Sequence, residues 1–349
     1  MAILRAHSFG ASFGFGYNPP EPGIDYYGGG SNWLSTVGGR LEFGVKVAAG
    51  NSPWEKYWIQ SSFAAKSEIY VQICEKTGVG VSNDYRWITF RAGTTELVVA
   101  KLKTDESIDF YRGDPDVGGV LLGSTSIDTL RIDGVFAYYE FRVKIDGSAG
   151  VVKMRKDGFE VFSFTGNTKP GAETTIDNIR TYNTPPGMIY SDFIINDTLG
   201  SYNNSWPGGA HVEFIKPDAA GAVTEWLPSS GSNYQCVDEF LPSASDYVTT
   251  DIPNVVDVYN LASIDGSAIV VSAIIPMYHI HYDGDPQTKY YQRVLRAGTT
   301  NYTSASRLAP ASTMTLDSWE VLETNPATGA PFTVSEINNL QLGLKAVTS

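Results

Sequence analysis

The sequence is poor in charged residues, histidine and cysteine. Only 18% of its 349 residues are Asp, Glu, Lys or Arg, and it has 4 histidines and 2 cysteines. Cys74 and Cys236 lie far apart along the chain, so they indicate neither a disulfide framework nor a cysteine-rich zinc site. We therefore expect two buried, reduced thiols, as in a protein made in the cytoplasm.

Positive charge and long apolar runs are also scarce. The chain has 25 Lys and Arg against 38 Asp and Glu, a formal net charge of −13, which argues against partners such as nucleic acid or an anionic membrane surface. The longest apolar run, Ala268–Met277, is interrupted by Ser272 and is shorter than the ~18 residues that a membrane helix needs. We expect it to form a buried strand. The first 16 residues lack the continuous apolar core of a signal peptide.

The residues that are abundant favour β structure. The chain contains 35 Gly and 20 Tyr, and 12% of its residues are aromatic. Helical periodicity is weak, and its best candidate, Ser335–Leu342, also fits a loop followed by a strand. The sequence therefore predicts an all-β sandwich, barrel or jelly roll. Runs typical of strands, bounded by Gly, Pro, Asn or Asp, are Arg40–Val47, Ser67–Glu75, Tyr85–Arg91, Glu96–Lys101, Phe136–Asp146 and Gly150–Arg155.

Two short motifs predict turns. Asp157-Gly158 separates two strand-like runs and suits a type I′ hairpin turn, because both central residues of that turn need positive φ. The sequence Arg-Ala-Gly-Thr-Thr occurs at 91–95 and again at 296–300, each time after a strand-like run. This repetition indicates either two similar turns or a distant duplication of one domain.

The length predicts two domains, and we place their boundary at about residue 198. Met188–Asn196 alternates like a closing strand, and the Gly- and Asn-rich residues that follow have the composition of a loop. Charge changes there too: residues 1–197 hold 19 basic and 23 acidic residues, and residues 198–349 hold 6 and 15. Within the first domain, residues 1–27 are rich in Gly, Pro and aromatic residues. We expect them to form an arm that packs on a neighbouring subunit.

Few residues form patterns typical of catalysis or ligation. We find no phosphate-binding loop, no serine-hydrolase elbow, no zinc-protease motif and no EF-hand loop, so we predict no catalytic and no cofactor-binding residues. His279 and His281 lie two apart, on one face of a strand, and with Asp283 they are candidate metal ligands; the alternative is a solvated strand face. Asp114 and Asp116 could bind calcium, and the alternative is a polar turn.

Aromatic residues give a second set of candidates. Trp33, Trp54, Tyr57 and Trp58 cluster in the first hundred residues. Exposed Trp and Tyr rings stack on sugars or form subunit interfaces, so these four are candidates for glycan or interface contacts. The alternative is that they fill the core of a sandwich.

Several segments resemble known families. Phe141–Gly147 and Lys156–Val161 resemble a hairpin of laminin-G/concanavalin-like jelly rolls. Ile189–Gly208 resembles a junction in tailed-bacteriophage virion proteins, where the jelly roll closes and a second β domain opens. The likeness covers about residues 130–349. It continues in the segments Glu213–Asp218, Thr224–Pro228, Gly231–Glu239 and Trp319–Gly343.

The resemblance implies a concanavalin-like jelly-roll sandwich (1–197) followed by a second β-sandwich domain (198–349). It implies a non-enzymatic structural component of a phage particle, in the tail, a fibre or the capsid decoration, made in the host cytoplasm. Its partners would be other virion proteins and further copies of itself, and a trimer fits a fibre. The alternatives are an adhesin that binds a host-surface glycan and, less favoured, a glycan depolymerase.

Overall fold

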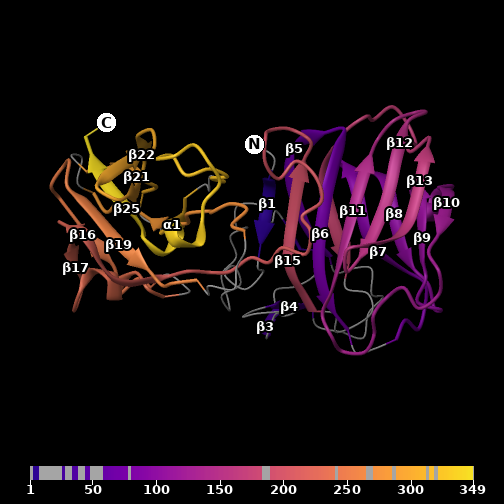
Figure 1. The fold of residues 1–349 in the computed structure, drawn as a ribbon, viewed down its shortest axis with the longest axis horizontal. Helices are drawn as coiled ribbons and strands as arrows, with labels where there is room; N and C mark the ends of the chain where they lie inside the picture. The colour runs from indigo at the N-terminus through magenta and orange to yellow at the C-terminus, as the bar shows by residue number, and fades with distance from the viewer. Residues whose placement is uncertain are drawn as a thin grey trace. The chain divides into compact units, whose positions relative to one another are not determined.

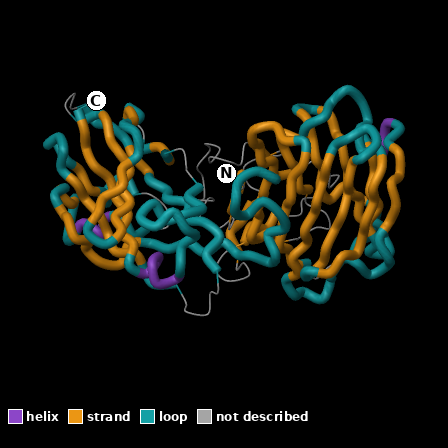
Figure 2. Tube along the Cα trace, turned by 45° about the horizontal axis from the view of Figure 1, so that its top comes forward, coloured by secondary structure: helices purple, strands orange, loops and turns teal. Residues whose placement is uncertain are grey.

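The structure, a computed structural model, is almost entirely β. It describes residues 3–7, 26–27, 34–37, 44–47, 58–77, 80–182, 189–239, 243–264, 270–284, 288–311, 314–317 and 321–348. The chain divides into two compact units, Met1–Glu213 and Phe214–Ser349 (Figures 1 and 2). Within the described residues, no helix is long and apolar enough to cross a membrane.

The first unit contains two antiparallel sheets, and the first of them has eight strands. Its order is β13-β12-β11-β6-β15-β4-β3, with β1 also paired to β15. The strands are β1 (Ile3–His7), β3 (Leu34–Val37), β4 (Gly44–Val47), β6 (Glu68–Lys76), β11 (Ala137–Lys144), β12 (Gly150–Lys156), β13 (Phe159–Gly166) and β15 (Ile189–Asp197).

The second sheet of this unit has seven strands in the order β10-β9-β8-β7-β14-β5-β2. These are β2 (Tyr26–Tyr27), β5 (Trp58–Lys66), β7 (Tyr85–Ala92), β8 (Thr95–Leu102), β9 (Ile108–Arg112), β10 (Val120–Ser124) and β14 (Ile176–Tyr182). One hydrophobic cluster takes residues from both sheets, so the sheets face each other as a sandwich. The predicted all-β, jelly-roll fold class is confirmed.

Aromatic rings dominate the core between the sheets. The Trp87 ring meets the Tyr139 and Phe141 rings edge-on, with centroids 5.1 and 5.4 Å apart. A carboxyl group lies among them: Glu75 is 2% exposed and accepts a hydrogen bond of 2.9 Å from Trp87 Nε1. Burial raises the pKa of Glu75 to about 8, so the core holds a neutral carboxyl at pH 7.

The local turn predictions are correct in this unit. Asp157 and Gly158 join β12 to β13 with φ angles of 48° and 85°, as a type I′ turn requires. The Ala-Gly-Thr-Thr part of the repeated motif forms the β7–β8 turn, and its second copy forms the turn between two strands of the other unit. Cys74 and Cys236 are both buried thiols.

The domain boundary lies further along the chain than the sequence suggested. The segment 198–213 belongs to the first unit because it packs back onto the eight-stranded sheet. The Arg155 guanidinium lies 4.0 Å from the centroid of the Trp206 ring, and Gly208 N donates to Glu140 Oε1 at 2.6 Å. Its loop-like composition marks a break in regular structure and not the end of the domain.

The second unit is built on a six-stranded antiparallel sheet, ordered β16-β19-β25-β21-β22 with β23 paired to β21. Two two-stranded sheets, β17–β18 and β20–β24, accompany it. The strands are β16 (Pro217–Thr224), β17 (Leu227–Pro228), β18 (Val248–Thr249), β19 (Val256–Leu261), β20 (His279–Ile280), β21 (Tyr290–Ala297), β22 (Thr300–Thr303), β23 (Arg307–Leu308), β24 (Thr315–Leu316) and β25 (Leu340–Val347).

Two features of this unit bear on the sequence predictions. The helix α1 (Val334–Asn338) is followed directly by β25, so Ser335–Leu342 contains both a short helix and the start of a strand. The predicted buried strand Ala268–Met277 is wrong for its described part, where Ile274 makes only an isolated bridge and Val270 is 73% exposed. Apolar residues alone do not make a strand without a partner edge.

Most of the predicted N-terminal arm lies outside the described residues. Its described pieces, β1 and β2, pair with β15 and β5 of the same chain. The expectation that residues 1–27 pack on another subunit therefore stays a prediction for the remainder of that segment.

Candidate functional site

The seven-stranded sheet presents a polar surface on the side opposite the core. Along β8, Val98, Ala100 and Leu102 belong to the core, so Lys101 points the other way. A β-bulge at Leu97 places Glu96, which is opposite Arg91, on that outer side as well. We call this surface the polar face. Its residues are Gln60, Arg86, Thr89, Arg91, Glu96, Lys101, Asp109, Tyr111, Asn178, Arg180 and Tyr182.

The strand register aligns these side chains in rows across the sheet. Arg91 on β7 is opposite Glu96 on β8 and Asn178 on β14. Thr89 is opposite Arg180, which in turn is opposite Gln60 on β5. Directly opposed residues in a sheet project from the same side, so residues distant in sequence form one surface.

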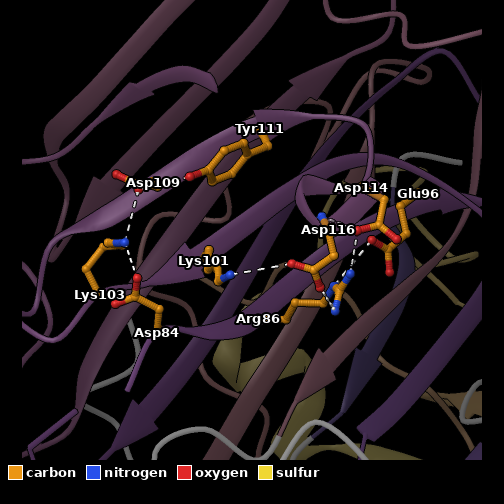
Figure 3. Close-up of polar contacts among 9 residues, drawn as sticks. All are labelled: Asp84, Arg86, Glu96, Lys101, Lys103, Asp109, Tyr111, Asp114 and Asp116. Carbon is orange, nitrogen blue, oxygen red and sulfur yellow. Dashed lines mark hydrogen bonds and ion pairs between the residues drawn. The ribbon is translucent and has the colours of Figure 1, made fainter. Parts of the chain in front are cut away.

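Arg86 is the centre of an ion-pair network at one side of the polar face (Figure 3). Its guanidinium contacts Glu96 at 3.5 Å, Asp116 at 2.7 Å and Asp114, and Lys101 lies 3.7 Å from Asp116. Asp114 caps the short 3-10 helix η2 (Pro115–Val117) by accepting a hydrogen bond from the Asp116 amide. The loop between β9 and β10 thereby holds both carboxylates against the sheet.

A second charged group lies beside Lys103, at the end of β8. Its ammonium pairs with Asp84 and lies 3.8 Å from Asp109, which accepts a hydrogen bond of 3.2 Å from the Tyr111 hydroxyl (Figure 3). The hydrogen bond to Asp84 raises the pKa of Lys103. Burial and the charge of Asp109 raise the pKa of Tyr111, so this phenol stays protonated and can donate a hydrogen bond.

Two arginines and a tyrosine occupy the polar face on β7 and β14. Arg180 Nε donates to Gln60 Oε1 at 2.7 Å, and Arg91 Nη2 donates to the Thr94 carbonyl at 2.6 Å. Burial, followed by the positive charge of Arg91, lowers the pKa of Arg180. Burial raises the pKa of Tyr182, so its hydroxyl also remains a donor.

Glu96 is a half-buried carboxyl of this surface. Its pKa is raised, first by burial, although the guanidinium of Arg86 acts in the opposite direction, and the charge of Asp114 adds to the increase. A carboxyl that holds its proton more tightly than usual, beside other titratable groups, is a common feature of functional sites.

The predicted metal candidates lie in two separate places among the described residues. Asp114 and Asp116 form a polar turn and face Arg86. His279, His281 and Asp283 are exposed side chains in and after β20. Among the described residues, no three His, Cys, Asp or Glu side chains gather closely enough to hold a metal ion.

The predicted aromatic candidates cannot be placed as a surface. Trp33, Trp54 and Tyr57 lie outside the described residues, and only the backbone of Trp58 is described, as the first residue of β5. Sequence reasoning missed Arg91 and Arg180. The sequence shows only that each arginine lies in a strand-like run. Arginines also occur in solvent-exposed strands that have no binding role, so this signal does not identify a site.

Comparison with solved structures finds similar β-sandwiches among carbohydrate-active proteins. An endo-β-1,4-glucuronan lyase from Trichoderma reesei is 12% identical, with a TM-score of 0.39, over 50% of this chain and 92% of that one. The carbohydrate-binding module CBM66 from Bacillus subtilis is 9% identical, TM-score 0.33, over 47% and 92%. A carbohydrate esterase from bacteriophage phi24B is 12% identical, TM-score 0.34, over 49% and 87%. No protein-family model and no curated protein sequence matches the chain.

These neighbours overturn one sequence prediction. We expected a protein that is not an enzyme, yet the similar structures include a glycan lyase and a carbohydrate esterase. The likeness concerns the fold, and a fold shared with enzymes gives no ground for excluding catalysis. The prediction rested on the absence of short catalytic motifs in the sequence. Catalytic residues can come from neighbouring strands of a sheet, and such residues form no short motif along the chain.

Proposed function

We propose that the protein binds a glycan chain on the polar face of the seven-stranded sheet. The observation that carries the proposal is the alignment of hydrogen-bonding side chains from β5, β7, β8, β9 and β14 on one surface. The middle of the polar face is buried, since Thr89, Arg91, Asn178 and Tyr182 expose 5% or less of their surface. A glycan would therefore contact the half-buried side chains of this face, which are Gln60, Arg86, Glu96, Lys101, Tyr111 and Arg180.

The chemistry of the polar face suits a polyhydroxyl ligand. Sugar hydroxyls both donate and accept hydrogen bonds, and this surface offers donors from arginine and tyrosine beside carboxylate and amide acceptors. Ion pairs with Asp114 and Asp116 fix the Arg86 side chain before any ligand arrives. Such fixed side chains reduce the entropy lost on binding.

Affinity electrophoresis of the full chain in gels that contain soluble polysaccharides tests this proposal. We expect at least one polysaccharide to retard the protein, and the variants Tyr111→Ala and Gln60→Ala to be retarded less. The control is Lys153→Ala, which removes a side chain that pairs with Glu160 at 2.9 Å on the other sheet. Equal retardation of all variants, or no retardation in any polysaccharide, would refute the proposal.

A second candidate function is cleavage of the bound glycan, favoured by the raised pKa of Glu96. A raised pKa increases the fraction of a carboxyl that holds a proton for donation to a glycosidic oxygen, and Asp114 places a second carboxylate on the same arginine. Release of new reducing ends from the retarding polysaccharide, abolished in Glu96→Gln, is the expected result. An intact polymer after long incubation would contradict cleavage and leave glycan binding as the one proposed function.

We further propose a setting for this activity, supported by the resemblance of Ile189–Gly208 to tailed-phage virion proteins. The protein would be part of a virion and contact a glycan on the host surface, and several copies would give avidity. Light scattering should find a homo-oligomer, and antibodies should detect the chain in purified particles. A monomer that is absent from particles would contradict this setting.

A further inference from the structure

The segment 198–213 is held on the outer side of the eight-stranded sheet, and we call this segment the strap. The centroid of its Trp206 ring lies 4.0 Å from the Arg155 guanidinium and 5.5 Å from the Tyr70 ring, which it meets edge-on. Four polar side chains of the sheet bond to the strap's main chain: Gln72 to the carbonyl of Ala210, Asn196 to the carbonyl of Ser205, Glu140 to the amide of Gly208 and Asp192 to the amide of Val212. The strap leads into the second unit, which begins at Phe214.

Glu140 and Gln72 oppose each other beneath the strap, and each has one oxygen without a donor. They are direct partners in the register of β11 and β6, so both side chains project from the same side of the sheet, and both are 0% exposed. In the described part of the chain, Glu140 Oε2 and Gln72 Oε1 have no hydrogen-bond partner. Gln72 cannot donate to Glu140, because the carbonyls of Asp192 and Ala210 take both hydrogens of its Nε2. Two buried acceptors without a donor destabilise a fold.

We propose that the Glu140 carboxyl carries a proton, that Oε2 donates it to Gln72 Oε1, and that this hydrogen bond keeps the strap on the sheet. One proton satisfies both oxygens, and Glu140 Oε1 still accepts from the Gly208 amide at 2.6 Å. When the carboxyl releases the proton to water, a buried carboxylate oxygen faces an amide oxygen that repels it. Lifting of the strap relieves this repulsion, because water then reaches the carboxylate. The strap is thus held at low pH and released as the pH rises.

Burial favours a proton at this position. It raises the pKa of Glu140, although the hydrogen bond from Gly208 and the charge of Arg155 act in the opposite direction. Arg155 is opposite Glu140 on β12, and its guanidinium lies over the Trp206 ring. Further charged or titratable groups at neighbouring positions of the sheet and in the strap are Tyr70, Tyr138, Arg142, Lys153, Asp192 and His211. All of them remain in a variant that changes Glu140 alone.

The substitution Glu140→Gln makes the bond to Gln72 independent of pH. The new amide can accept from Gly208 through its oxygen and donate to Gln72 Oε1 through its nitrogen. Because the pKa of Glu140 is raised in the folded chain, the proton stabilises the bound strap fully below pH 4.5 and less as the pH rises through the raised value. Hydrogen–deuterium exchange of the full chain measures the opening of the strap in native chain and variant, from about pH 5 to about pH 9.

We expect the two proteins to differ least at about pH 5, and the native strap to open more often as the pH rises. The native-to-variant ratio of exchange rates should increase by up to about tenfold per pH unit and level off once the pH passes the pKa of Glu140. The matched control is Glu160→Gln, which removes a carboxylate from β13 of the same sheet, where it pairs with Lys153 at 2.9 Å. The ratio for this control should not change with pH.

A constant ratio for Glu140→Gln would overturn the proposal, since Glu140 would then be ionised in the folded chain throughout this range. If Glu140→Gln does not fold, a chain that carries Glu75→Gln provides the test, because its sandwich core no longer titrates at Glu75. The protection of its strap should fall with rising pH more steeply than the protection of β12, and equal slopes would contradict the proposal. None of these outcomes depends on glycan binding.

Discussion

The buried carboxyl of Glu75 predicts a specific dependence of stability on pH. Burial raises its pKa from 4.5 to about 8, so the folded protein holds a proton there that the unfolded chain releases. Its contribution to stability is fully present below pH 4.5 and is lost as the pH rises towards 8. The free energy of unfolding should therefore fall by about 1.4 kcal/mol per pH unit across this range from Glu75 alone.

The substitution Glu75→Gln isolates this effect. Glutamine keeps an oxygen to accept the hydrogen bond from Trp87 Nε1 and has no proton to lose. Between about pH 5.5 and about pH 7.5, the stability of the variant relative to the native chain should rise by roughly 3 kcal/mol. Urea denaturation of the native chain and the variant, followed by tryptophan fluorescence, measures the difference.

An exposed glutamate provides the control for this experiment. Glu173→Gln, in the loop before β14, removes one acid group from the surface of the same unit. If the difference between native chain and Glu75→Gln is the same at every pH, Glu75 is not held neutral by burial and the reasoning is wrong.

Three further predictions concern stability. Trp206→Ala should lower the stability of the first unit by about 1–3 kcal/mol, since it removes the ring that packs against Arg155; an unchanged urea midpoint would contradict this. Gly158→Val should cost about 1 kcal/mol or more, because φ is 85° there; circular dichroism melting would detect the shift. Asp317→Ala should destabilise the second unit by about 3–5 kcal/mol, because it leaves Arg293, 2.9 Å from it and buried, without its carboxylate; calorimetry would measure this.

Local rules succeeded where neighbouring residues determine the structure. The Asp157-Gly158 turn follows from the positive φ that it needs. The strands β6, β7, β8, β11 and β12 follow from runs of strand-forming residues bounded by turn residues. Even α1 carries a local signal, a capping box in which Thr333 and Glu336 bond to each other's backbone amides.

Features set by tertiary contacts could not be predicted. The domain boundary lies beyond residue 198 because the segment 198–213 packs Trp206 against the eight-stranded sheet. Its loop-like composition does not show this contact. The polar face was missed because Arg91 and Arg180 become neighbours only when β7 pairs with β14, and strand order is not encoded in alternation. A carboxyl such as Glu75 can likewise be recognised as buried only when the opposite sheet is known.

The central claim is that a glycan binds on the polar face of the seven-stranded sheet. Hydrogen–deuterium exchange of the full chain, with and without a retarding polysaccharide, tests it most directly. The account predicts slower exchange at the ends and turns of β7, β8, β9 and β14, with no change in β11 or β12. Protection confined to the eight-stranded sheet or to the second unit would contradict it.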